Sequence, residues 1–129
     1  MLSYEAQTAG PPATAWALMA RPARWKEWAP HIRGAWRLGD PEVQVGRRGL
    51  VRVLGAPLVP ARITRKRGGR MWAWKVGPVE LTHRVEPSDG GALVAVDIEA
   101  PGALEPALGA TYGPLVQLLV NRLARLAER

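Results

Sequence analysis

Apolar and polar side chains alternate along much of the chain, which is the period-two pattern of strands with one buried face. The alternation runs from Leu2 to Gln7 and returns after Pro30. Turn-forming residues at Gly55-Ala56-Pro57, Gly68-Gly69 and Ser88-Asp89-Gly90-Gly91 divide the second region into consecutive strands. The pattern predicts strands at residues 2–7, 32–38, 46–54, 59–66, 71–76, 79–86 and 93–99.

Helical spacing of apolar residues replaces this alternation in two parts of the chain. Two short helices are predicted after the first strand, at residues 12–19 and 22–28, each beginning at a proline. Near the C-terminus, apolar residues three and four apart predict a long amphipathic helix over Leu115–Glu128. Gly113-Pro114 lies at or just inside the start of that helix, which predicts a kink or a late start.

This order of elements predicts an α+β fold with an antiparallel sheet of about six to seven strands. The sheet has an apolar face that needs a cover, and the C-terminal helix is the one predicted element large enough to provide it. The chain has 129 residues, of which 47% are hydrophobic and 22% are charged. This length and balance predict a single domain that spans residues 1–129.

Composition excludes several kinds of chemistry. The chain has no cysteine, so disulfides, thiolate nucleophiles and cysteine-based zinc sites are ruled out. His31 and His83 are the two histidines, which argues against a multi-histidine metal site, and no metal or cofactor is expected. The N-terminus lacks a signal-peptide pattern and no apolar run reaches the ~20 residues of a spanning helix. A cytoplasmic location is therefore expected.

The chain is strongly basic, with 18 Lys and Arg residues against 11 Asp and Glu. Many of these cations occur in one central segment: Arg47, Arg48, Arg52, Arg62, Arg65, Lys66, Arg67 and Arg70. Such a segment either holds phosphate or an anionic lipid headgroup, or forms the solvent face of two strands. Arg52 shares a strand face with Leu50 and Leu54, so it is a candidate carboxylate ligand should that face line a cavity. The opposite assignment, with Val51 and Val53 inward, is left open.

Six tryptophans supply most of the aromatic surface, since phenylalanine is absent. Each offers a large apolar area and one N–H donor, which suits flat apolar ligands. Three on the short helices, Trp16, Trp25 and Trp28, are expected to pack in the core. Trp36, Trp72 and Trp74 lie on sheet faces and are candidate ligand-binding residues.

Titratable side chains offer one candidate for acid–base chemistry. His83 lies on the apolar face of its strand, where it is either a core residue or, in a cavity, a general acid or base. Tyr112 is expected to present its hydroxyl to the same space, whereas His31 is expected to be exposed. Asp97 and Glu99 are expected on a solvated face, and no Ser–His–Asp arrangement is present.

The order of elements, together with several short motifs, resembles the START-like (SRPBCC) superfamily, which includes polyketide cyclase/dehydrase-like and Bet v 1-like proteins. The motifs are Ala15-Trp16-Ala17-Leu18, Trp25 through Ile32, His83-Arg84-Val85-Glu86-Pro87 with Gly90-Gly91, and the final helix. The resemblance implies a helix-grip fold, in which a curved antiparallel sheet wraps around the C-terminal helix and encloses a cavity. Members bind lipids, sterols, polyketides, hormones or quinones, and a minority are enzymes. The superfamily has no shared catalytic motif.

These observations lead to three hypotheses about function. The first is binding of a small hydrophobic ligand, with aromatic, polyketide-like and lipid-like molecules left open, by Trp36, Trp72, Trp74, His83, Tyr112 and Arg52. The alternative is a cyclase/dehydrase-type enzyme that uses His83 as general acid or base. The third is a basic surface module for nucleic acid or anionic lipid, although no motif for specific nucleic-acid recognition is present. The chain is expected to be a monomer or a homodimer.

Overall fold

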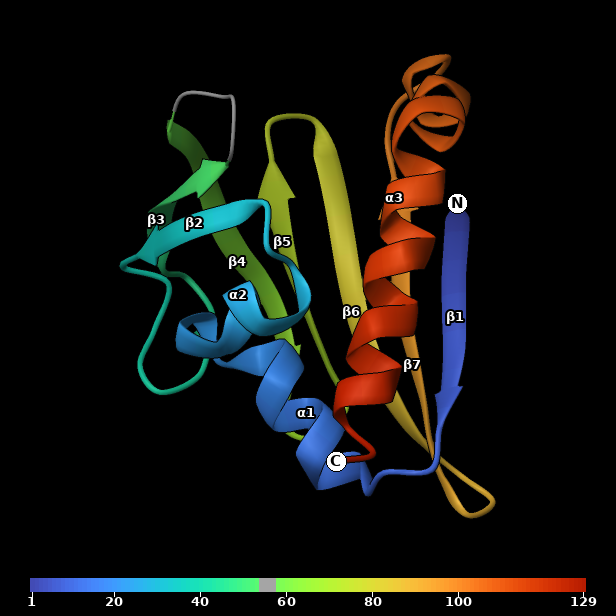
Figure 1. Cartoon of the computed structure of the whole chain (residues 1–129). Helices are drawn as coiled ribbons and strands as arrows, with labels where there is room; N and C mark the ends of the chain where they lie inside the picture. The colour runs from blue at the N-terminus through green and yellow to red at the C-terminus, as the bar shows by residue number, and fades with distance from the viewer. Residues whose placement is uncertain (54–57) are drawn as a thin grey trace.

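Seven antiparallel strands form one curved sheet in the computed structural model, which describes residues 1–53 and 58–129 (Figure 1). The order across the sheet is β1-β7-β6-β5-β4-β3-β2. The first strand therefore pairs with the last, and the remaining strands follow in decreasing order to β2 at the other edge. The predicted turn at Gly55-Ala56-Pro57 falls on residues 54–57, outside the described residues. The strands are β1 (Leu2–Thr8), β2 (Ile32–Trp36), β3 (Arg48–Val53), β4 (Leu58–Arg67), β5 (Met71–Val76), β6 (Val79–Ser88) and β7 (Gly91–Glu99).

Helices cover the inner face of this sheet. The long helix α3 (Leu104–Leu126) packs across β1 and β7, as Figure 1 shows. The connection from β1 to β2 contains α1 (Pro12–Ala20), the 3-10 turn η1 (Pro22–Arg24) and α2 (Trp25–Trp28). These short elements contact both α3 and the strands. The arrangement confirms the predicted α+β class and the helix-grip fold.

Helix α3 begins about ten residues before Leu115, so the prediction of a late start is wrong. Pro114 has no N–H to donate to the carbonyl of Ala110, but Ala110 is exposed and water can satisfy that carbonyl. Gly113 is buried and allows Tyr4 of β1 to approach closely. A Cβ at Gly113 would lie 2.6 Å from the Tyr4 hydroxyl oxygen. Glycine at this position therefore serves the packing of α3 on β1.

Indole N–H groups satisfy the last carbonyls of α1. The N–H of Trp28 donates to the Leu18 carbonyl over 2.8 Å. The carbonyl of Met19 accepts from Trp25 at 2.8 Å and from Trp72 at 3.1 Å. Helix ends leave such carbonyls without intrahelical partners. These tryptophans thus join α1, α2 and β5 in the core, as predicted for Trp25 and Trp28.

The outer face of the sheet carries a buried ion pair between β6 and β7. Asp97 is 6% exposed and accepts from Arg84 Nε at 2.6 Å and Nη2 at 3.0 Å. Ser3 of β1 donates to the same carboxylate over 2.8 Å. The expectation of a solvated Asp97 is wrong, because β1 and the Arg84 side chain cover it.

Candidate functional site

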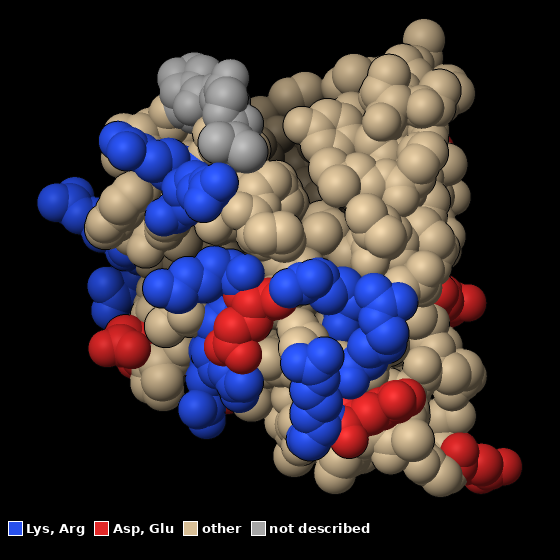
Figure 2. All heavy atoms as spheres, viewed as in Figure 1, with Lys and Arg blue, Asp and Glu red and all other residues tan. Residues whose placement is uncertain are grey.

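An apolar pocket of about 270 Å³ lies between the inner face of the sheet and the N-terminal half of α3. Figure 2 shows the surface hollowed beside the upper part of α3. Aliphatic side chains from six strands and from α3 form most of its wall. They are Val51, Val53, Val59, Val76, Val79, Leu81, Ile98, Leu108 and Val116, together with Ile32 of β2.

Three side chains bring polar atoms to this apolar wall: His31, Trp74 and Tyr112. The Nδ1 atom of His31 and the Nε1 atom of Trp74 are buried, and neither has a hydrogen-bond partner within the described residues. They are the two buried side-chain polar atoms of that kind in residues 1–53 and 58–129. Burying an unpartnered polar atom is unfavourable. Both atoms thus lack a partner, and both belong to residues that line the pocket.

Trp74 differs from the tryptophans whose rings pack in the core and whose N–H groups also have hydrogen-bond partners. Trp25, Trp28 and Trp72 bond to the end of α1, and Trp16 donates to Glu42 over 3.0 Å. The ring of Trp74 packs edge-on against Trp25 and Trp72, at centroid distances of 5.2 and 5.3 Å. Its ring is therefore fixed, while its N–H has no hydrogen-bond partner within the described residues.

The structure places His83 outside the lining of this pocket. It is 5% exposed, and its ring stacks on Trp72 with centroids 3.8 Å apart and planes 7° apart. Its Nδ1 lies 3.4 Å from the Trp72 carbonyl oxygen. Burial lowers the pKa of His83 to about 4, against a smaller opposing effect of that carbonyl. His83 is therefore a neutral core residue at pH 7. It does not reach the ligand space, contrary to its prediction as a ligand-binding residue.

Trp36 and Arg52 also lie away from the pocket, on the outer face of the sheet. On β3, Val51 and Val53 point inward, so the intervening Arg52 points outward. Trp36 pairs with Leu50 on that same outer face and is 47% exposed. Neither residue therefore lines this pocket, although Trp36 does line the pocket under β2 that is described below. Trp72 lies on the inner face, where its ring stacks against both Trp25 and His83, and it is not in the pocket lining. Trp74 and Tyr112 are the predicted ligand-binding residues that the structure brings together.

His31 is the residue that the sequence pattern missed. It was expected to be exposed in the turn after Pro30, but it is half-buried and lines the pocket. Burial lowers the pKa of His31 below its ordinary value. No local pattern marks it, because its position depends on where the α2–β2 connection crosses the sheet.

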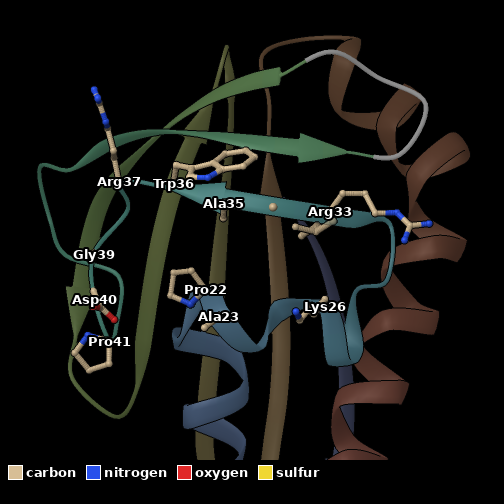
Figure 3. Close-up of a pocket in the computed structure, with 12 residues that line it drawn as sticks. Pro22, Ala23, Lys26, Arg33, Ala35, Trp36, Arg37, Gly39, Asp40 and Pro41 are labelled. Carbon is tan, nitrogen blue, oxygen red and sulfur yellow. The ribbon is translucent and has the colours of Figure 1, made fainter.

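A second pocket, of about 390 Å³, lies under β2 (Figure 3). It is bounded by Pro22 and Ala23 of η1 and by the segment that follows β2. Lys26, Arg33, Arg37 and Asp40 give it a more polar wall, and Figure 3 shows Arg37 directed away from the hollow. The buried polar atoms without partners lie in the first pocket, which is therefore the stronger candidate site.

No group of three or more His, Cys, Asp or Glu residues is arranged to hold a metal ion in residues 1–53 and 58–129. No helix in this part of the chain has the length and apolarity needed to cross a membrane.

Comparison with known proteins gives one family and many structural neighbours. The family model described as polyketide cyclase/dehydrase and lipid transport matches residues 2–128. No protein of curated description matches the sequence significantly.

Three solved structures illustrate the likeness in fold. A protein of Bacillus halodurans, BH1534, is 12% identical with a TM-score of 0.75, covering 98% of this chain and 95% of its own. The crystal structure of Ara h 8.0201 gives 13% identity and a TM-score of 0.72, with coverage of 98% and 95%. DynU16, from the dynemicin biosynthetic locus, is 16% identical with a TM-score of 0.73, and the match covers 98% of this chain and 46% of DynU16. At these identities the likeness shows the fold alone.

Proposed function

This chain belongs to the polyketide cyclase/dehydrase and lipid transport family, and we propose that it binds a compact, largely apolar ligand bearing a hydrogen-bonding oxygen in the pocket beneath α3. The observation that carries the proposal is the pair of buried, unpartnered nitrogen atoms of His31 and Trp74 in an otherwise aliphatic wall. Small-molecule sites typically combine such a wall with a few polar groups that fix orientation.

The chemistry of the two nitrogen atoms restricts the ligand. An indole N–H can only donate, so the ligand atom facing Trp74 is an acceptor such as a carbonyl, phenol or ether oxygen. The lowered pKa of His31 keeps its ring neutral near pH 7, and a neutral imidazole nitrogen either donates or accepts according to its tautomer. Tyr112, half-exposed on α3, offers a hydroxyl at the edge of the same space. A flat ring with one or two oxygen substituents meets these requirements.

The pocket volume favours a small ring system over a two-chain lipid. A volume near 270 Å³ is just below the usual range for small-molecule sites, about 300–1,000 Å³. Two full acyl chains need far more space than that.

Titration with naphthalene, 1-naphthol and 1,4-naphthoquinone tests the proposal, because these ligands share a shape and differ in oxygen. Binding is followed by calorimetry and by the indole N–H signals in NMR spectra. The oxygenated ligands are expected to bind more tightly and to shift the Trp74 N–H signal. Trp74→Phe keeps an aromatic ring and removes the donor, so it should weaken 1,4-naphthoquinone binding by about five- to tenfold and leave naphthalene binding nearly unchanged.

Trp36→Phe is the matched control, because Trp36 lies outside the pocket, and this variant should bind all three ligands as the parent does. The proposal is refuted when none of the three ligands binds, or when Trp74→Phe and Trp36→Phe affect 1,4-naphthoquinone equally. Extraction of the purified protein with organic solvent, followed by mass spectrometry, would identify any ligand that copurifies.

A proton-transfer role on a bound ligand would fall to His31 rather than His83, since His31 contributes an unpartnered ring nitrogen to the pocket. A cyclase or dehydrase reaction is therefore tested by comparing His31→Asn with His83→Gln. Loss of turnover in His31→Asn alone supports this role. Equal turnover in both variants and the parent excludes an imidazole base.

A further inference from the structure

The outer face of β2, β3, β4 and β5 carries three cations side by side. Arg48 on β3 is directly opposite Arg62 on β4, and Arg62 is directly opposite Lys75 on β5. All three side chains are exposed. Like charges directly opposite each other in adjacent strands destabilise a sheet. This cation row, Arg48, Arg62 and Lys75, is thus unfavourable in the isolated protein unless an anion lies against it.

No carboxylate lies within ion-pair distance of these cations in residues 1–53 and 58–129. Glu80 of β6 is directly opposite Lys75, but its carboxylate pairs with Arg65. No ion pair there includes Arg48, Arg62 or Lys75, or the nearby Arg52. The other half of the same outer face is different, since Arg84 bonds to Asp97 and Arg65 lies 3.1 Å from Glu80. The cation row therefore lacks the carboxylate partners that hold Arg84 and Arg65 on the rest of this face.

An apolar row runs beside these cations. Trp36 of β2 is opposite Leu50 of β3, and Leu50 is opposite Pro60 of β4. Trp36 is 47% exposed and Leu50 40% exposed. Arg52 lies two residues beyond Leu50 on β3, so cations flank this apolar row, Trp36, Leu50 and Pro60, on both sides.

The Trp36 ring lies flat on the sheet. In Figure 3 its indole extends along β2, on the side away from Pro22 and Ala23. A Cβ at Gly34 would lie 2.7 Å from the Cη2 atom of this ring, so glycine leaves the space that the ring occupies. The fold thus holds a large amphipathic side chain at the surface in a defined orientation.

We propose that this outer face of β2–β5 docks on an anionic membrane surface. Tryptophan favours the boundary between headgroups and acyl chains, and arginine and lysine side chains lie along apolar surface while their charged ends reach the phosphates. Single-stranded nucleic acid uses several aromatic platforms on which bases stack. Here one tryptophan stands beside a leucine and a proline, which provide no such platform, so the arrangement favours lipid.

Co-sedimentation with vesicles tests the proposal, using phosphatidylcholine with and without phosphatidylglycerol. The parent protein is expected to bind the phosphatidylglycerol vesicles, more weakly at high salt, and not the neutral ones. The double substitution Arg48→Gln with Arg62→Gln should weaken binding by roughly twentyfold, because each cation at an anionic surface contributes about fivefold. Arg125→Gln with Arg129→Gln on the C-terminal segment changes net charge equally and should stay within about twofold of the parent.

The apolar row has its own matched pair of variants. Trp36→Ser should weaken binding to phosphatidylglycerol vesicles several-fold, whereas Leu118→Ser, at an even more exposed apolar position on α3, should not. The cation-row variant should also melt at the same temperature as the parent or higher, because it relieves repulsion between β3 and β4.

Four outcomes would overturn the proposal. One is the absence of binding to phosphatidylglycerol vesicles, and another is equal weakening by the cation-row variant and its charge-matched control. A third is equal weakening by Trp36→Ser and Leu118→Ser. The fourth is tight binding of a single-stranded oligonucleotide that the cation-row variant abolishes, while vesicles do not bind, which would assign the face to nucleic acid.

Discussion

The buried imidazole of His83 should make the stability of this protein depend on pH in a calculable way. The structure seals its ring between Trp72 and the core, and burial lowers its pKa to about 4. In the unfolded chain the same group has an ordinary pKa of about 6.5. Between these two pH values the unfolded chain takes up a proton that the native protein excludes. The free energy of unfolding therefore falls as the pH falls through this window.

The magnitude follows from the two pKa values. Each pH unit inside the window changes the free energy of unfolding by about 1.4 kcal/mol. From pH 7 to pH 5, His83 should account for a loss of about 2 kcal/mol, approaching 3 kcal/mol at pH 4. Above pH 7 the residue is neutral in both states and the contribution is constant. The interval from pH 7 to pH 5 is the cleanest, since carboxyl groups with ordinary or lowered pKa values remain ionised there.

Urea unfolding of the parent and of His83→Gln at pH 7, 6 and 5 measures this effect. The variant has no group to titrate at this position, so it should lose about 2 kcal/mol less than the parent between pH 7 and pH 5. A difference in stability at pH 7 does not enter this comparison. His31→Asn provides a control. The pKa of His31 is also lowered by burial, so this second histidine changes the free energy of unfolding with pH in the same direction, and its variant measures that share separately. Identical pH profiles for the parent and His83→Gln would refute the reasoning, since His83 would then accept a proton while still folded.

Further predictions concern the packing of the sheet. Gly113→Ala should destabilise the protein by about 1–3 kcal/mol in thermal or urea unfolding, because its Cβ would meet the hydroxyl of Tyr4; in a Tyr4→Phe background the cost should largely vanish. Asp97→Asn should cost about 2 kcal/mol at pH 7 by weakening the bonds from Arg84. Hydrogen bonds from Arg84 and Ser3 outweigh burial and lower the pKa of Asp97, so this cost should disappear as the pH falls through that lowered value. An Asp97→Asn variant as stable as the parent at pH 7 would contradict the assigned ion pair.

The alternation of side chains was sufficient to predict the strands and the α+β class. Strand β5 was predicted with its exact bounds, and Trp72, Trp74 and Val76 were correctly placed together on one face. Such parity is local, because successive side chains of a strand point to opposite faces whatever the rest of the chain does. Helical spacing likewise identified α1 and the C-terminal half of α3. The start of α3 was missed because Gly113-Pro114 interrupts the local pattern, while packing against Tyr4 maintains the helix.

Local patterns could not decide which face of a strand turns inward. On β3 both assignments satisfied the alternation, and the tertiary structure turned Val51 into the pocket and Arg52 outward. The same limitation placed Trp36 among the cavity candidates, although it lies on the outer face. Which face is buried depends on where α3 packs, and that contact joins residues far apart in the chain.

The candidate site is likewise a product of tertiary structure. Composition indicated tryptophan and histidine as the residues with suitable chemistry, and Trp74 and Tyr112 do meet at the pocket. The two histidines show this: His83 is sealed against Trp72, which is the core alternative that the sequence left open, whereas His31, expected to be exposed, lines the pocket. A sequence determines which hydrogen-bonding groups exist and which of them share a strand face. Whether such a group finds a partner in the core or remains unpaired in a cavity depends on long-range packing, and in this protein that difference separates a core histidine from a candidate binding residue.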